Sequence, residues 1–157
     1  ISVTATTVLP TNASSNIGAS GNKWQAVYAT TFSGAASNAQ YADLAERYNS
    51  DADYEPGTVV MIGGEKEATA CEFEHRAIGT ISEKPAYLMN SEGEGQAIAL
   101  KGRVPIKVIG KTIKGLPLVA SQIVGVATQG FWSDDYFAIS LETSFEEHER
   151  LIEGLIL

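Results

Sequence analysis

From residue 56 onward, short apolar and β-branched runs alternate with glycine, proline and small polar residues. Runs of this length are typical of β-strands, and a dipeptide such as Pro56-Gly57 is favoured in turns. The predicted strands are residues 58–62, 78–81, 97–100, 104–109, 116–120, 123–127 and 136–141. This series predicts an all-β barrel or sandwich, which we expect to span residues 49–157.

Two parts of this domain depart from a simple strand pattern. Pro105 has no backbone N–H to donate, so we expect the strand at residues 104–109 to lie at a sheet edge or to carry a bulge. The acidic residues 145–150 are compatible with a helix. The apolar residues within 151–157 are equally compatible with a closing strand that Gly154 interrupts. The order of the strands is not predicted.

The first 40 residues differ in composition from the rest of the chain. They contain no aspartate or glutamate, and Lys23 is their one basic residue, whereas all 19 acidic residues follow them. Such a step marks a structural boundary. Because Ile1 already lies inside a threonine-rich pattern, we expect the chain to be the C-terminal part of a longer protein. We assign residues 1–36 to an extended, shaft-like segment.

Within this segment, aromatic residues alternate with small and polar ones. A Ser/Thr-rich linker would have a similar composition. However, the alternation predicts a strand with one aromatic face, and the preceding NASSNIGASGN supplies turn residues. One chain has too few large apolar residues to cover that face, whereas parallel copies, three for example, could share it. The predicted interface residues are Trp24, Tyr28, Phe32, Tyr41 and Leu44.

Between the two regions, residues 37–48 have the pattern of a short helix. Ser37 and Gln40 have the spacing of a capping box, and Asp43 and Arg47 form an i,i+4 pair. We therefore predict a connecting helix at residues 37–48, which is too short to be stable alone and should dock on its neighbours. Its apolar stripe consists of Tyr41, Leu44, Ala45 and Tyr48.

Charge and hydropathy limit the partners of the protein. The net charge is −8 and the pI is about 4.7, which disfavours binding to nucleic acid or to anionic membranes. We predict no membrane insertion, because no apolar run approaches the roughly 20 residues that a spanning helix needs. The first residues, ISVTATT, also lack the basic and apolar regions of a signal peptide.

The sequence contains few residues that could hold a metal or a cofactor. Cys71 is the only cysteine, so it cannot form an intrachain disulfide or a thiolate cage. Cys71 and His75 are four residues apart, but two ligands are too few and His148 is distant in sequence. No nucleotide-binding loop or catalytic signature occurs. We predict no metal and no cofactor.

One loop has the composition of a sugar-binding site. Residues 130–136 read GFWSDDY, in which aromatic rings stand beside carboxylates and a hydroxyl. The alternative is that Trp132 and Tyr136 anchor a turn in the core. The candidate receptor residues are Phe131, Trp132, Asp134 and Tyr136.

Several sequence blocks resemble one family. NIGASGNKWQAVYATTFSG followed by YADLAE is similar to the junction between shaft and terminal domain in fibre proteins of tailed bacteriophages. The resemblance continues through YEPGTVVMIGG, AIGTISEKPAYLMNS, ALKGRVPIKVIG and KGLPLVAS, and so covers nearly the whole chain. The same blocks resemble C-terminal intramolecular-chaperone domains of phage fibres, some of which cleave themselves off after assembly.

The resemblance implies a homotrimeric virion protein with an intertwined β-shaft and an all-β terminal domain. Its partners would be two further copies, other tail or fibre proteins and a host surface glycan. In self-cleaving relatives, acids of the YADxAE signature are implicated, and these correspond to Asp43 and Glu46. Leu44 stands where such members often carry an aromatic residue. On local chemistry alone, both acids are ordinary solvated residues.

We therefore expect a structural component of a phage tail fibre that serves assembly and attachment to the host surface. The alternative is an autoproteolytic chaperone domain that directs trimerisation of the fibre. Self-cleavage is the only enzymatic activity considered.

Overall fold

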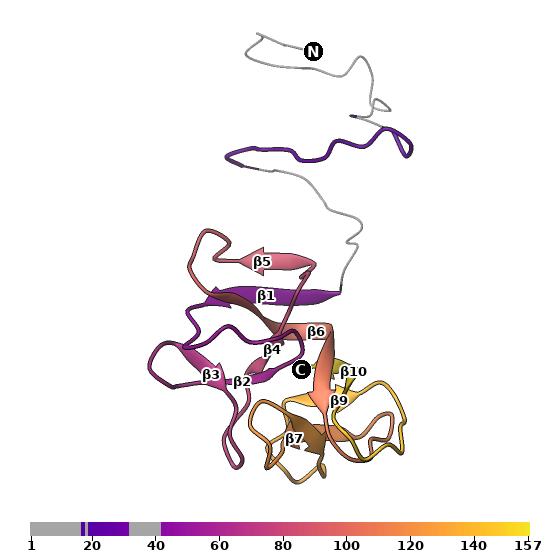
Figure 1. The fold of residues 1–157 in the computed structure, drawn as a ribbon. Coiled ribbons are helices and arrows are strands. Elements are labelled where there is room, and N and C mark those ends of the chain that lie inside the picture. Colours follow the sequence, from indigo (N-terminus) through magenta and orange to yellow (C-terminus); the bar gives the residue numbers. More distant parts are fainter. Residues whose placement is uncertain (1–16, 18, 32–41) are drawn as a thin grey trace. The chain divides into compact units, whose positions relative to one another are not determined.

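The computed structural model describes residues 17, 19–31 and 42–157 (Figure 1). The chain divides into two compact units, Ile1–Ala36 and Ser37–Leu157. In the described part of the first unit, the only β-pairing is an isolated bridge between Ala19 and Asn22. Their backbone N–H groups donate to each other's carbonyl oxygens at 3.1 and 3.0 Å around a tight turn. The predicted strand around Trp24 has no β-partner within residues 19–31.

The second unit is built from strands, and the described residues contain no helix. The predicted all-β class is confirmed. The strands are β1 (Asp43–Tyr48), β2 (Val59–Ile62), β3 (Ala68–Ala70), β4 (Gly79–Ile81), β5 (Tyr87–Met89), β6 (Gln96–Val108), β7 (Pro117–Ala120), β8 (Ala127–Gln129), β9 (Ala138–Ser140) and β10 (Arg150–Ile156).

Five of these strands close into a barrel. β6 pairs with β10, β10 with β9, β9 with β7, and β7 with β8, all antiparallel. A parallel pairing of Val108 on β6 with Ala127 on β8 completes the ring. Closure leaves these strands with few unpaired edges.

The remaining strands extend from the same long strand. β4 pairs with the first half of β6, β2 pairs with β4, and β3 pairs with β2. On its other side, the first half of β6 pairs antiparallel with β1, which in turn pairs parallel with β5. β6 is therefore the strand that joins the barrel to the other strands, as Figure 1 shows.

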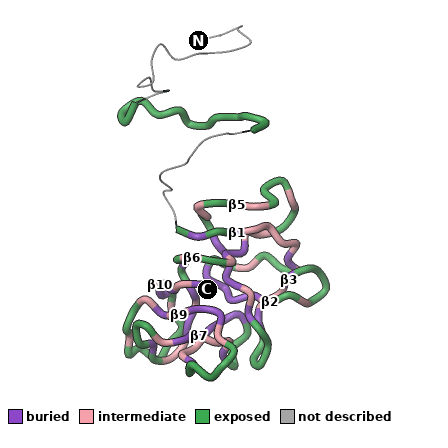
Figure 2. Tube along the Cα trace, turned by 180° about the vertical axis from the view of Figure 1, so that it is seen from behind, coloured by how far each residue is buried: buried purple, intermediate pink, exposed green. Residues whose placement is uncertain are grey.

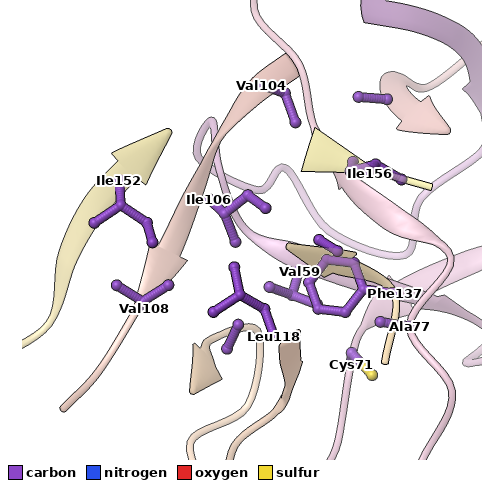
Figure 3. Close-up of a cluster of buried hydrophobic side chains, with 13 residues drawn as sticks. Val59, Cys71, Ala77, Val104, Ile106, Val108, Leu118, Phe137, Ile152 and Ile156 are labelled. Atoms are coloured by element: carbon purple, nitrogen blue, oxygen red, sulfur yellow. The ribbon is translucent and has the colours of Figure 1, made fainter. Parts of the chain in front are cut away.

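The barrel interior is filled by side chains that alternate along the strands. On β6, Val104, Ile106 and Val108 are buried, whereas Pro105 between them is exposed, as expected for a strand with one face in a core. They pack with Leu118, Phe137, Ile152 and other apolar residues in one cluster (Figure 3). Figure 2 shows that buried positions concentrate along these strands.

A second cluster lies under the other strands. Val60, Ala68, Ile81 and Ile98 are buried together, and Tyr48, Tyr54, Ile78 and Leu100 pack against them. Tyr48 comes from β1, so this cluster fixes the first strand of the unit against the rest.

The predicted connecting helix at residues 37–48 is wrong where the structure describes it. Residues 43–48 form strand β1, and residues 37–41, including Tyr41, lie outside the described residues. Asp43 and Ala45 are buried while Leu44 between them is exposed, which is the alternation of a strand. Hydrogen bonding to β5 and β6 on both sides has overridden the local helical pattern.

The structure shows how the chain runs around Pro105 and in the tail at residues 145–157, where the sequence allowed alternatives. β6 as a whole is a central strand, but on its side away from β10 it pairs with β1 only up to Gly102 and with β8 only at Val108, so Pro105 lies at a local edge, which was one of the two predicted alternatives. The neighbouring N–H groups of Arg103 and Lys107 point away from β10 and donate to the carbonyls of Ala42 and Gly57. The missing N–H of Pro105 therefore falls where β6 has no partner strand. In the tail, β10 runs through Gly154 as the closing strand.

Candidate functional site

The predicted trimer-interface residues of the first unit are exposed where they are described. Trp24 is 63% exposed and Tyr28 is 97% exposed, and Val27 beside them is also exposed. Phe32 and Tyr41 lie outside the described residues. Three large apolar side chains in a short segment are thus mostly exposed.

The remaining interface residue, Leu44, lies on β1. Its direct partner on β5 is Tyr87, and both side chains are exposed. Directly opposite residues of paired strands project to the same face, so Leu44 and Tyr87 form one apolar pair on the surface. Tyr87 was not among the predicted residues, because the parallel pairing of β1 with β5 is not visible in the sequence.

The first candidate acid, Asp43, is buried, with 5% of its surface exposed. Its Oδ2 accepts a 2.6 Å hydrogen bond from the Ser82 hydroxyl, and its Oδ1 accepts one from the Ala86 N–H at 3.3 Å. Among the described residues, no lysine, arginine or histidine forms an ion pair with Asp43. The buried carboxylate is thus held by neutral donors.

The second candidate acid, Glu46, lies in a different environment. Its carboxylate accepts a hydrogen bond from the Tyr48 hydroxyl at 3.1 Å. Burial, and after it this hydrogen bond and the charge of Glu46, raise the pKa of Tyr48. Asp43 and Glu46 belong to one strand but share no hydrogen-bond partner among the described residues.

A hollow of about 400 Å³ opens beside Asp43. Ser82, Lys84 and Arg103 contribute polar groups to its wall, and Leu151 contributes an apolar one. Sequence reasoning missed Ser82, which stands 39 residues from Asp43. The hollow thus combines a buried carboxylate, a hydroxyl and two cations.

The candidate receptor loop at residues 131–136 has a fixed backbone. The Phe131 N–H donates to Oδ2 of Asp134 at 2.7 Å, and the Asp134 N–H donates to the Phe131 carbonyl at 3.0 Å. Phe131 is 75% exposed and Trp132 is 57% exposed. Tyr136 is half-buried and meets Trp132 edge to face, with ring centroids 5.4 Å apart. The Asp134 carboxylate therefore stabilises the loop, whereas the rings of Phe131 and Trp132 are exposed to solvent.

A second loop, residues 72–76, lies against this one. Both loops and β7 line a hollow of about 360 Å³. Arg76 of one loop and Asp135 of the other form an exposed ion pair at 3.8 Å. Phe73 adds a third exposed aromatic ring. This pairing of loops is not visible in the sequence, because the two loops are more than 50 residues apart.

The described residues contain no group of three or more histidine, cysteine, aspartate or glutamate side chains that could hold a metal ion. Cys71 is fully buried, and burial, with a smaller effect from the charge of Glu72, raises its pKa to about 11. Such a thiol is unreactive at neutral pH. Among the residues described, none belongs to a helix that could span a bilayer.

The second unit belongs to the class of all-β barrels that carry additional paired strands. Its fold is similar to that of the pre-mature bacteriophage phi29 gene product 12, with a TM-score of 0.60 and 15% sequence identity over 75% of this chain. It is also similar to a C-terminal fragment of the same phi29 gene product, with a TM-score of 0.57 and 15% identity over 73% of this chain and 100% of the fragment.

The alignment covers 22% of the pre-mature gene product 12, so the chain corresponds to about a fifth of that protein. No protein-family model matches the sequence, and neither does any curated protein. At this level of identity, the likeness establishes a shared fold.

Proposed function

We propose that the chain is part of a homotrimeric bacteriophage fibre or tail appendage that assembles into the virion and contacts the host surface. In this proposal, the segment at residues 1–36 belongs to a shaft shared by three copies, and the β-domain stands at its end. The likeness to phi29 gene product 12 supports the phage assignment of the β-domain.

The observation that carries the trimer is the exposure of Trp24, Val27 and Tyr28. These side chains occupy a stretch without strand pairing, so neither their apolar surface nor their backbone groups are covered by the described residues. Neighbouring copies would cover both at once, because each copy offers the strand edge and the aromatic face that the next one lacks. The exposed pair of Leu44 and Tyr87 would give the β-domain an apolar contact of its own with a neighbouring copy.

Mass photometry or light scattering of the purified chain tests this proposal. We expect a trimer at micromolar concentration, and we expect Trp24→Ser combined with Tyr28→Ser to weaken it. Phe145→Ser, at an exposed aromatic position of the β-domain, is the matched control. A wild-type chain that stays a stable monomer overturns the proposal.

The burial of Asp43 beside Ser82 favours a second candidate function. The Asp43 carboxyl group is buried at a hollow whose wall also carries the Ser82 hydroxyl, so an acid and a hydroxyl lie within hydrogen-bond distance of each other beside the start of β1. The second proposal is a chaperone module that directs trimerisation and then cuts the chain near residues 37–48, with Asp43 or Glu46 assisting the scission.

Intact-mass measurement of the expressed chain separates the two proposals. Under the second proposal, a smaller product accumulates with time, and Asp43→Asn or Glu46→Gln stops the cut without preventing trimer formation. If the uncut mass persists after long incubation, the β-domain is a permanent part of the fibre.

A further inference from the structure

We propose that the loops at residues 72–76 and 131–136 form one binding surface for a neutral saccharide. This inference rests on the proposed attachment function, for which it names the class of partner. It goes beyond the single loop indicated by the sequence, because the structure brings a second loop and a hollow to the same place.

The first argument is the shape of the surface. The hollow of about 360 Å³ is lined by Phe73, His75 and Arg76 on one side and by Asp134 and Asp135 on the other. Its size falls within the range of about 300–1,000 Å³ that is typical of small-molecule sites. The floor is provided by β7, which lies at the end of the domain away from β1 (Figures 1 and 2).

Secondly, the two loops at residues 72–76 and 131–136 combine aromatic rings with polar groups. Phe73, Phe131 and Trp132 expose aromatic rings on the two loops. A pyranose ring has an apolar C–H face, which packs on an aromatic ring, and hydroxyl groups at its edge, which need donors and acceptors. His75 and Asp135, which line the hollow together with Phe73, supply such groups. The two loops thus offer both aromatic rings and polar groups to a ligand.

The third argument is that the binding loop is organised in advance. Asp134 bonds the Phe131 N–H, and Tyr136 supports Trp132 edge to face. Glu74, at the tip of the other loop, has a φ of 63°, a left-handed conformation uncommon outside glycine. Loops that are already ordered lose less conformational entropy when a ligand binds.

The negative charge of the two loops favours a neutral partner over an anionic one. The two loops carry four carboxylates, which outnumber the single guanidinium of Arg76. This excess repels anionic partners such as acidic polysaccharides, and it also repels the same surface on a second copy of the chain. A neutral saccharide can pack on the aromatic rings, and the carboxylates do not repel it. The carboxylates belong to Glu72, Glu74, Asp134 and Asp135.

The chain contains two tryptophans, which allows a direct test. In a Trp24→Phe variant, the intrinsic fluorescence reports Trp132 alone. We expect a saturable change in emission when maltotriose, cellotriose or mannotriose is added at millimolar concentration, and no such change with trigalacturonate. The Trp132→Phe variant, which reports Trp24 alone, should show no response to any of them.

Further variants on the Trp24→Phe background locate the surface. Phe131→Ala and Phe73→Ala should each weaken binding about tenfold, whereas Phe145→Ala, at an exposed aromatic outside both loops, should not. Circular dichroism confirms that each variant is folded. Absence of a saturable response to all three neutral sugars, a preference for trigalacturonate, or a response insensitive to Phe131→Ala would overturn the inference.

The oligomeric state is measured on the chain with its native Trp24, because Trp24 is itself a proposed interface residue. A monomer that binds a neutral sugar would contradict the proposed trimer but not the saccharide surface. A trimer that binds none of the sugars would contradict the surface alone.

Discussion

The hydroxyl of Ser82 donates a 2.6 Å hydrogen bond to the carboxylate of Asp43, and both side chains are buried. The bond joins the first residue of β1 to the segment that follows β4. The Ala86 N–H reinforces the link, donating to the Asp43 carbonyl at 3.0 Å and to its Oδ1 at 3.3 Å. Asp43 thus fixes the start of the β-domain, whether or not it takes part in cleavage.

Removing the Ser82 hydroxyl should destabilise the domain. In Ser82→Ala, a buried carboxylate loses its short hydrogen bond, so we expect the free energy of unfolding to fall by about 1–3 kcal/mol. Urea denaturation at fixed protein concentration measures the change. Ser91→Ala, at an exposed position, is the control. Equal stability of both variants would show that the bond contributes nothing.

Gly154→Ala should destabilise the barrel through one contact. A Cβ at position 154 would clash with Cδ1 of Ile106, whose side chain is fully buried in the core. We expect a loss of about 1–3 kcal/mol. In an Ile106→Val background, which lacks Cδ1, the same substitution should cost less. Additive losses in the double variant would contradict this explanation.

Cys71 should resist alkylation in the native protein. Its pKa of about 11 leaves very little thiolate at mildly alkaline pH, and its side chain is fully buried. We expect iodoacetamide to modify it slowly in buffer and much faster in denaturing urea, as followed by intact mass. Similar rates in both conditions would show that the segment around Cys71 opens readily.

The stability of the domain should depend on Asp51 at acidic pH. The Tyr54 hydroxyl donates a 2.6 Å hydrogen bond to Asp51 and, with a smaller effect from Thr69, lowers the pKa of Asp51 from its ordinary value of 3.8. A lowered pKa in the folded state stabilises the protein above the ordinary value, and this contribution is lost as the pH falls through the lowered one.

Tyr54→Phe should therefore reduce stability at neutral pH and have less effect well below pH 3.8. Urea denaturation at both pH values measures the difference. Tyr87→Phe, which removes an exposed hydroxyl, is the control. An equal loss from Tyr54→Phe at both pH values would assign the effect to packing.

The all-β class was predictable because local signals carry it. Alternation such as that of Val104, Ile106 and Val108, with turn residues between runs, gives strands without knowledge of their partners. β1 was missed because the sequence DLAERY shows no alternation of apolar and polar residues: the strand buries Asp43 and exposes Leu44, so the local pattern favoured a helix. The pairing of β1 with β6, some 50 residues later, stabilises the strand instead.

The candidate sites were less predictable for the same reason. Asp43 and Trp132 could be selected by residue type, but their neighbours Ser82 and the loop at residues 72–76 come from distant parts of the sequence. The position of Pro105 shows the same limit. Its missing N–H identifies a break in pairing, yet only the path of Gly57 beside β6 shows where that break lies.

The closure of the barrel by β10 has a consequence for biosynthesis. β6 can be complete and β7, β8 and β9 present, but the ring stays open until Arg150–Ile156 has left the ribosome. Non-local pairings of this kind form late and slowly. In the fibre proposed above, the preceding segments of neighbouring nascent chains would thus have time to meet before their terminal domains fold.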